Sequence, residues 1–89
     1  MNLSTILAKK EMKMKLVPHG SNQNVLIFDN GTKVLFSYQT PVAAFHPVKG
    51  WLRTDKKFSV TTSKHINKWL AGLNASTISQ SFLDNLVVG

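Results

Sequence analysis

The chain has 89 residues, a length that fits one small domain and not two. Eleven Lys and Arg against four Asp and Glu give a formal charge of +7, and 43% hydrophobic residues suffice for a small core and argue against disorder. The absence of Cys excludes disulfides and thiolate metal sites. The sequence therefore predicts a single basic domain over residues 1–89.

The N-terminal segment holds a short apolar stretch followed by Lys9 and Lys10. A secretory signal has the opposite order, and no apolar run approaches the roughly 20 residues that span a bilayer. The expected location is therefore the cytoplasm of a host cell, with no membrane partner. Residues 1–11 are expected either to stay loose or to form a short helix. The apolar and basic residues that alternate over 12–16 predict an edge strand.

Residues 24–38 carry the pattern of a β-hairpin. β-Branched and aromatic residues dominate two runs that flank Asn30-Gly31, and both turn residues tolerate the positive φ that a two-residue type I′ turn requires. Such a turn would pair Asp29 with Thr32. The resulting register leaves three apolar side chains on a face that must be covered by a helix, the N-terminal segment or a second subunit: Leu26, Phe28 and Leu35.

A second hairpin is predicted from the short runs 41–45 and 51–54, which are joined around residues 46–50. After residue 58 the hydrophobic period becomes helical. A first helix is predicted to begin with the hydroxyl residues 61–63 and to end at Gly72 or Asn74. Its apolar stripe has the spacing i, i+3, i+4, i+7: Ile66, Trp69, Leu70 and Leu73.

A second helix is predicted after Ser76 or Asn74, because the helical spacing recurs at Ile78, Phe82 and Leu86. The predicted fold class is α+β. It consists of a small antiparallel sheet of four or five strands within residues 12–60, built from hairpins, followed by one or two C-terminal helices within 61–87.

Two motifs in the chain resemble those of a family of small uncharacterised proteins encoded by phages, plasmids and some archaea. The first is Y-x-T-P-V-A at residues 38–43, and the second is T-T-S-K-H-I-N at residues 61–67. The resemblance extends over about residues 25–86. It implies a setting on a mobile element and implies no chemistry, because the family has no agreed activity.

Basic and aromatic residues alternate through the middle of the chain and run into the start of the first helix. Lys and Arg neutralise phosphates, aromatic rings stack on bases, and helix N-termini favour anions. The same residues have a plainer interpretation, in which Trp51 belongs to the core, the hydroxyls are caps and the lysines keep the protein soluble. The candidate nucleic-acid or anion site comprises Lys49, Trp51, Arg53, Lys56, Lys57, Thr62, Ser63, Lys64 and Lys68.

An enzyme is not predicted. The four acidic residues are far apart in sequence, which gives no support for a carboxylate pair, and there is no Gly-rich phosphate loop. His19, His46 and His65 match no metal-ligand spacing. No catalytic residue, metal or cofactor is therefore expected.

Two hypotheses of function remain. The first is a small basic accessory protein of a phage or mobile element that binds DNA or RNA through a Lys/Arg face with little sequence preference. The alternative is an effector that inhibits a host enzyme or defence complex by occupying the surface of an acidic host protein. A homodimer through the face that carries Leu26 and Phe28 is left open.

Overall fold

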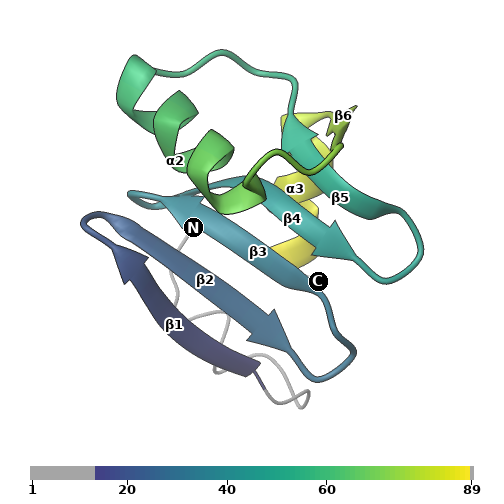
Figure 1. Cartoon of the computed structure of the whole chain (residues 1–89). Helices are drawn as coiled ribbons and strands as arrows, with labels where there is room; N and C mark the ends of the chain where they lie inside the picture. Colours follow the sequence, from purple (N-terminus) through teal and green to yellow (C-terminus); the bar gives the residue numbers. More distant parts are fainter. Residues whose placement is uncertain (1–13, 89) are drawn as a thin grey trace.

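The computed structural model describes residues 14–88, which form a six-stranded sheet with two helices (Figure 1). The predictions for residues 1–11, and the basic residues Lys9, Lys10 and Lys13, lie outside the described part of the chain. The elements are β1 (Met14–Gly20), β2 (Gln23–Phe28), β3 (Lys33–Ser37), β4 (Thr40–His46), β5 (Gly50–Thr54), α2 (Val60–Leu70), β6 (Ser76–Ile78) and α3 (Gln80–Val88).

The strands lie in the sheet in the order in which they occur in the chain. β1 to β5 form an antiparallel meander, and β6 pairs parallel to β5 after the crossover through α2. The predicted α+β class and both predicted hairpins are confirmed. The strand count of four or five is wrong, because the segment expected to be wholly helical, 61–87, contains β6.

The turn between β2 and β3 differs from the prediction. Gly31 N donates to Phe28 O at 3.0 Å, and Phe28 N donates to Thr32 O at 2.9 Å, which closes a three-residue loop. Gly31 has a φ of 94°, whereas Asn30 is not among the described residues with positive φ. A type I turn followed by a left-handed glycine therefore replaces the predicted type I′ turn.

This longer loop shifts the register of the hairpin by one residue. Val25 lies opposite Leu35 and Leu26 lies opposite Val34, in place of the predicted pairing of Leu26 with Leu35. Because side chains alternate across a sheet, the shift moves Leu35 to the face opposite Leu26. The predicted face of Leu26, Phe28 and Leu35 therefore does not exist as one surface.

Replacing Gly31 with Ala is expected to lower the free energy of unfolding by about 1–2 kcal/mol, because an L-residue is strained in the left-handed region. A Cβ at this position would have no atom within 4 Å, so the cost arises from the backbone and not from a clash. Urea unfolding measures the loss. Gly31→Asn should lose less, since Asn tolerates this conformation; an equal loss for both variants would contradict the assigned turn.

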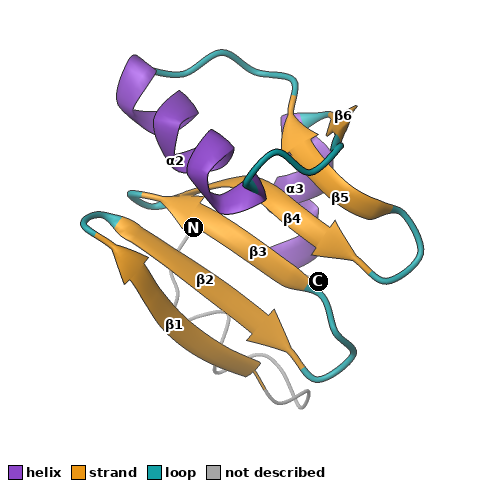
Figure 2. Ribbon diagram, in the orientation of Figure 1, coloured by secondary structure: helices purple, strands orange, loops and turns teal. Residues whose placement is uncertain are grey.

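Each face of the sheet is covered by one helix, with α2 in front and α3 behind in Figure 2. The core on the α3 face consists of Leu26, Phe28, Val34, Phe36, Ala44, Leu83 and Val87. The core on the α2 face consists of Val25, Leu35, Val42, Ala43, Ile66 and Leu70. Since Leu26 is 1% exposed and Phe28 6%, neither offers a free surface for a homodimer.

Helix α2 begins earlier than predicted. Ser59 is its N-cap and accepts a hydrogen bond from Thr62 N at 3.2 Å, whereas the cap was expected within 61–63. The helix ends where Ala71 adopts a left-handed conformation and donates to Asn67 O at 2.9 Å, so that Leu73 lies beyond the helix and is 47% exposed. Over the described residues, neither helix has the length and apolar character needed to cross a bilayer.

Candidate functional site

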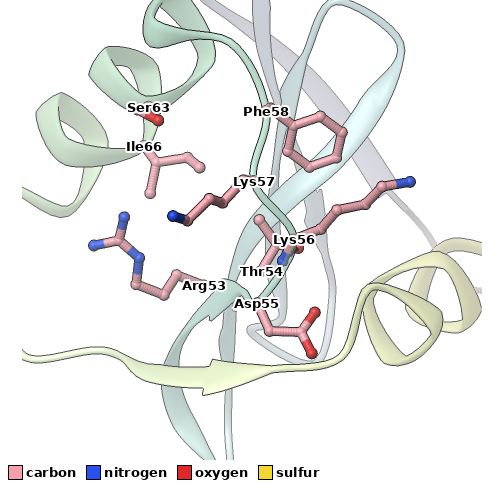
Figure 3. Close-up of a pocket in the computed structure, with 8 residues that line it drawn as sticks. All are labelled: Arg53, Thr54, Asp55, Lys56, Lys57, Phe58, Ser63 and Ile66. Carbon is pink, nitrogen blue, oxygen red and sulfur yellow. Dashed lines mark hydrogen bonds between the residues drawn. The ribbon is translucent and has the colours of Figure 1, made fainter.

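A pocket of about 310 Å³ lies between the end of β5, the segment 55–58 and helix α2 (Figure 3). It contains three cations and one carboxylate, together with two hydroxyls and two apolar side chains. Four of the predicted site residues, Arg53, Lys56, Lys57 and Ser63, meet at this pocket. Its lining is Arg53, Thr54, Asp55, Lys56, Lys57, Phe58, Ser63 and Ile66.

The segment that follows β5 is fixed at both of its ends. Thr54 Oγ1 accepts a hydrogen bond from Lys56 N at 3.1 Å, which turns the chain as it leaves the strand. Phe58 packs against the core on the α2 face, and Lys56 Nζ lies 5.6 Å from the centre of its ring. These contacts hold the backbone of Lys57 beside the pocket.

Two cations point into the same space. In Figure 3 the ends of Arg53 and Lys57 are directed toward the region below Ser63 and Ile66, while Lys56 extends away. Arg53 Nη1 donates to Asn67 Oδ1 at 3.4 Å, a long bond to a neutral amide. The positive charges of Arg53 and Lys57 repel each other in this partly enclosed space, so their arrangement favours an anion bound between them.

The two predicted hydroxyl residues differ in accessibility. Ser63 is half-buried and borders the pocket, so its hydroxyl can reach a ligand there. Thr62 is 5% exposed, and its Oγ1 forms a hydrogen bond of 3.0 Å with Ser37 Oγ. The prediction that Thr62 contacts an anion is therefore wrong, because this side chain ties α2 to β3.

The remaining predicted residues are divided between two locations. Lys64 and Lys68 are exposed one turn apart on α2, and neither lines the pocket. Lys49 lies in the loop at the opposite end of β5, where its Nζ is 5.5 Å from the ring centre of Phe82 in α3. The structure therefore does not bring Lys49 to the pocket.

Trp51 shares a face of β5 with Arg53, as predicted, but is half-buried. Its ring centre lies 5.5 Å from that of Trp69 in an edge-to-face contact and 4.8 Å from that of Phe45. Such aromatic contacts stabilise a core beyond the area they bury. These contacts favour the plainer interpretation of Trp51, in which it is a packing residue and not a platform for bases.

Sequence reasoning missed the polar contacts between β3 and α2. Ser37 Oγ lies 2.8 Å from His65 Nδ1, in addition to its bond with Thr62. A Ser–His pair can indicate a nucleophile, but Ser37 is 2% exposed and cannot meet a substrate.

Sequence reasoning also missed Asn67, whose side chain accepts a hydrogen bond from Arg53. The available signal was the position of Asn67 one helical turn after Ser63. Over the part of the chain that is described, no three His, Cys, Asp or Glu side chains cluster as metal ligands.

Residues 14–85 match the profile of a family of unknown function (DUF8033). The chain belongs to this family. The match agrees with the resemblance to an uncharacterised family and assigns no activity to DUF8033. No curated protein and no solved structure matches the chain.

The two motifs that carry the resemblance lie within the DUF8033 region and meet in space. Tyr38, in the first motif, has its ring centre 6.1 Å from that of His65, in the second. Tyr38 adopts a φ of 57°, which turns the chain between β3 and β4. The contact joins this turn to α2.

Proposed function

We propose that this DUF8033 protein binds nucleic acid through the α2 side of its sheet. Arg53 and Lys57 would contact phosphates at the pocket, and Lys64 and Lys68 would contact further phosphates along α2. The observation that carries the proposal is the convergence of Arg53 and Lys57, from a strand and from a loop, on one pocket beside the Ser63 hydroxyl. Guanidinium and ammonium groups are the usual protein ligands of phosphate.

The two helical layers differ in charge, which supports the choice of side. α2 carries Lys64 and Lys68, whereas α3, from Gln80 to Val88, contains Asp84 and no Lys or Arg. A surface on which cations outnumber carboxylates attracts a polyanion and orients it as it approaches. The α2 side would therefore meet the phosphate backbone first.

The mode of binding would be sequence-independent. The candidate contacts are cations and a hydroxyl, which bind phosphate and do not read base edges. Together with the resemblance to phage and plasmid proteins, this chemistry suits an accessory protein that coats or holds nucleic acid.

Fluorescence anisotropy of labelled single-stranded DNA, duplex DNA and RNA tests the proposal. Four phosphate contacts should weaken binding roughly a hundredfold between about 50 and 200 mM salt. The triple variant Lys57→Gln/Lys64→Gln/Lys68→Gln should bind more weakly. The slope of the logarithm of its binding constant against the logarithm of the salt concentration should become shallower by about 0.7–0.9 for each contact removed.

Lys49→Gln and Lys57→Gln form a matched pair, because each removes one exposed cation. Lys57→Gln should reduce affinity and salt slope, and Lys49→Gln should leave both unchanged. Equal effects of the two would show that only net charge matters. Absence of binding to all three nucleic acids at low salt would overturn the proposal, and tight, salt-insensitive binding to one acidic protein would support an effector instead.

A further inference from the structure

We infer that the pocket holds the terminal phosphate of a nucleic-acid strand, a phosphomonoester, in preference to an internal phosphodiester. The inference rests on the proposed function and names the group that the pocket binds. Three of its features support this assignment: the concentration of donors, the size and enclosure of the space, and the apolar wall beside the cations.

Two positive charges, from Arg53 and Lys57, end in the same space, whereas the Asp55 carboxylate, which also lines the pocket, is directed away from them in Figure 3. A phosphomonoester carries about −1.5 to −2 charges at pH 7, whereas each internal phosphate carries one. Arg53 presents a planar fork that can bind two phosphate oxygens, and Lys57 and Ser63 can donate to the third. Lys64 and Lys68 lie in the open and suit singly charged phosphates further along the strand.

The size and enclosure of the pocket suit the end of a strand. A volume of about 310 Å³ is at the lower end of small-ligand sites, which suits a small group such as a phosphate with its sugar. β5, the segment 55–58 and α2 border the space on three sides (Figure 3). A strand that passed through would need two open sides, whereas a strand that ends in the pocket needs one.

The apolar residues explain where the rest of the terminal nucleotide would lie. Ile66 borders the space into which Arg53 and Lys57 point, whereas the Phe58 ring lies on the Lys56 side of the segment 55–58 (Figure 3). The sugar or base would therefore contact Ile66 while the phosphate contacts the cations. Arg53 can exchange its bond to Asn67 for a phosphate oxygen at little cost, since that bond is 3.4 Å long. The strand would then leave the pocket over Lys64 and Lys68.

The test compares labelled single strands of one sequence that end in a 5′-phosphate, a 3′-phosphate or hydroxyls at both ends. The readout is the ratio of the dissociation constants of the hydroxyl-ended and phosphate-ended strands. The native protein should prefer one phosphorylated end by about tenfold or more, as hydrogen bonds between charged groups imply. This ratio is insensitive to a general loss of affinity, which affects both strands alike.

Variants separate the pocket from the rest of the surface. Ser63→Ala removes the hydroxyl and leaves the Ser59 cap in place, and Arg53→Lys keeps the charge but loses the fork. Both should lower the ratio toward one. Lys64→Gln/Lys68→Gln should weaken binding of all strands and keep the ratio, and Lys49→Gln should change neither quantity.

The outcomes distinguish this inference from the proposed function. Salt-dependent binding with a ratio of one would overturn end recognition and leave nucleic-acid binding standing. Failure to bind any strand would overturn both. A nucleoside 5′-monophosphate that binds as tightly as the phosphorylated strand would also overturn end recognition, because the pocket would then be a site for free nucleotides.

Discussion

The Leu83→Ala variant is expected to lose about 2–5 kcal/mol of the free energy of unfolding, the largest effect of any single truncation considered. Leu83 is 0% exposed and belongs to the core between α3 and the sheet, with Leu26, Val34 and Phe36 among its members. Truncation removes buried methyl groups and leaves a cavity that the rigid sheet cannot close. A domain of this size has a small stability margin, so a fraction of the variant should be unfolded at 37 °C.

Urea unfolding followed by circular dichroism measures this loss, with thermal unfolding as a second measure. Each kcal/mol should lower the Tm by about 4–8 °C in a domain of this length. Leu73→Ala is the matched control, because Leu73 is the same residue type, lies outside both helices and is 47% exposed. Its effect should stay within about 0.5 kcal/mol. Equal effects of the two variants would show that α3 is not packed on the sheet.

Local sequence signals predicted the elements that depend on local chemistry. Asn30-Gly31 marked the first hairpin, and the spacing of Ile66, Trp69 and Leu70 marked the buried stripe of α2. These signals act within a few residues, so no knowledge of the remaining chain is needed to use them. The α+β class followed from their order in the sequence.

The register of the first hairpin could not be obtained in the same way. Alternation of apolar and polar residues fixes a register only where one face is polar, and here both arms are apolar on both faces. Asn-Gly is compatible with a type I′ turn and also with a type I turn followed by a left-handed glycine. The choice depends on the two helices that cover the faces, because each packs against one set of side chains.

β6 was missed because its strand character is tertiary. Ser76–Ile78 has three residues and a single half-buried apolar side chain, Ile78, which also fits a helical spacing. The strand exists because it pairs with Leu52, Arg53 and Thr54 of β5 after the crossover. Such pairing is invisible to a local pattern.

The candidate site was predictable only where its residues are neighbours in the sequence. Lys56 and Lys57 follow β5 after one intervening residue, Asp55, so their proximity to Arg53 follows from sequence distance alone. The approach of Ser63 depends on how α2 crosses the sheet, and the separation of Lys49 depends on which end of β5 faces the pocket. Thr62 was misassigned because a helix start exposes some side chains and buries others according to the neighbouring strand.

Gln80→Ala should produce the second large loss of stability, about 2–4 kcal/mol, because it leaves buried polar groups without partners. Gln80 Nε2 donates to Pro41 O at 2.6 Å and to Asp84 Oδ1 at 3.1 Å, and Gln80 Oε1 accepts from Thr54 Oγ1 at 2.6 Å. Pro41 and Thr54 are both buried, so water cannot readily replace the lost bonds. One side chain thus links the start of α3 to β4 and β5.

Asn85→Ala is the control for Gln80→Ala, since Asn85 is an exposed amide in the same helix and its loss should leave the free energy of unfolding nearly unchanged. A cycle with Thr54→Val measures the coupling, which we expect at about 0.5–3 kcal/mol if the two side chains are bonded. Thr54 Oγ1 also holds Lys56 N at the edge of the pocket, so Gln80 stabilises the basic segment from across the sheet. A coupling near zero would mean that Gln80 stabilises α3 alone, and the support for the pocket would then have to come from Phe58 and α2.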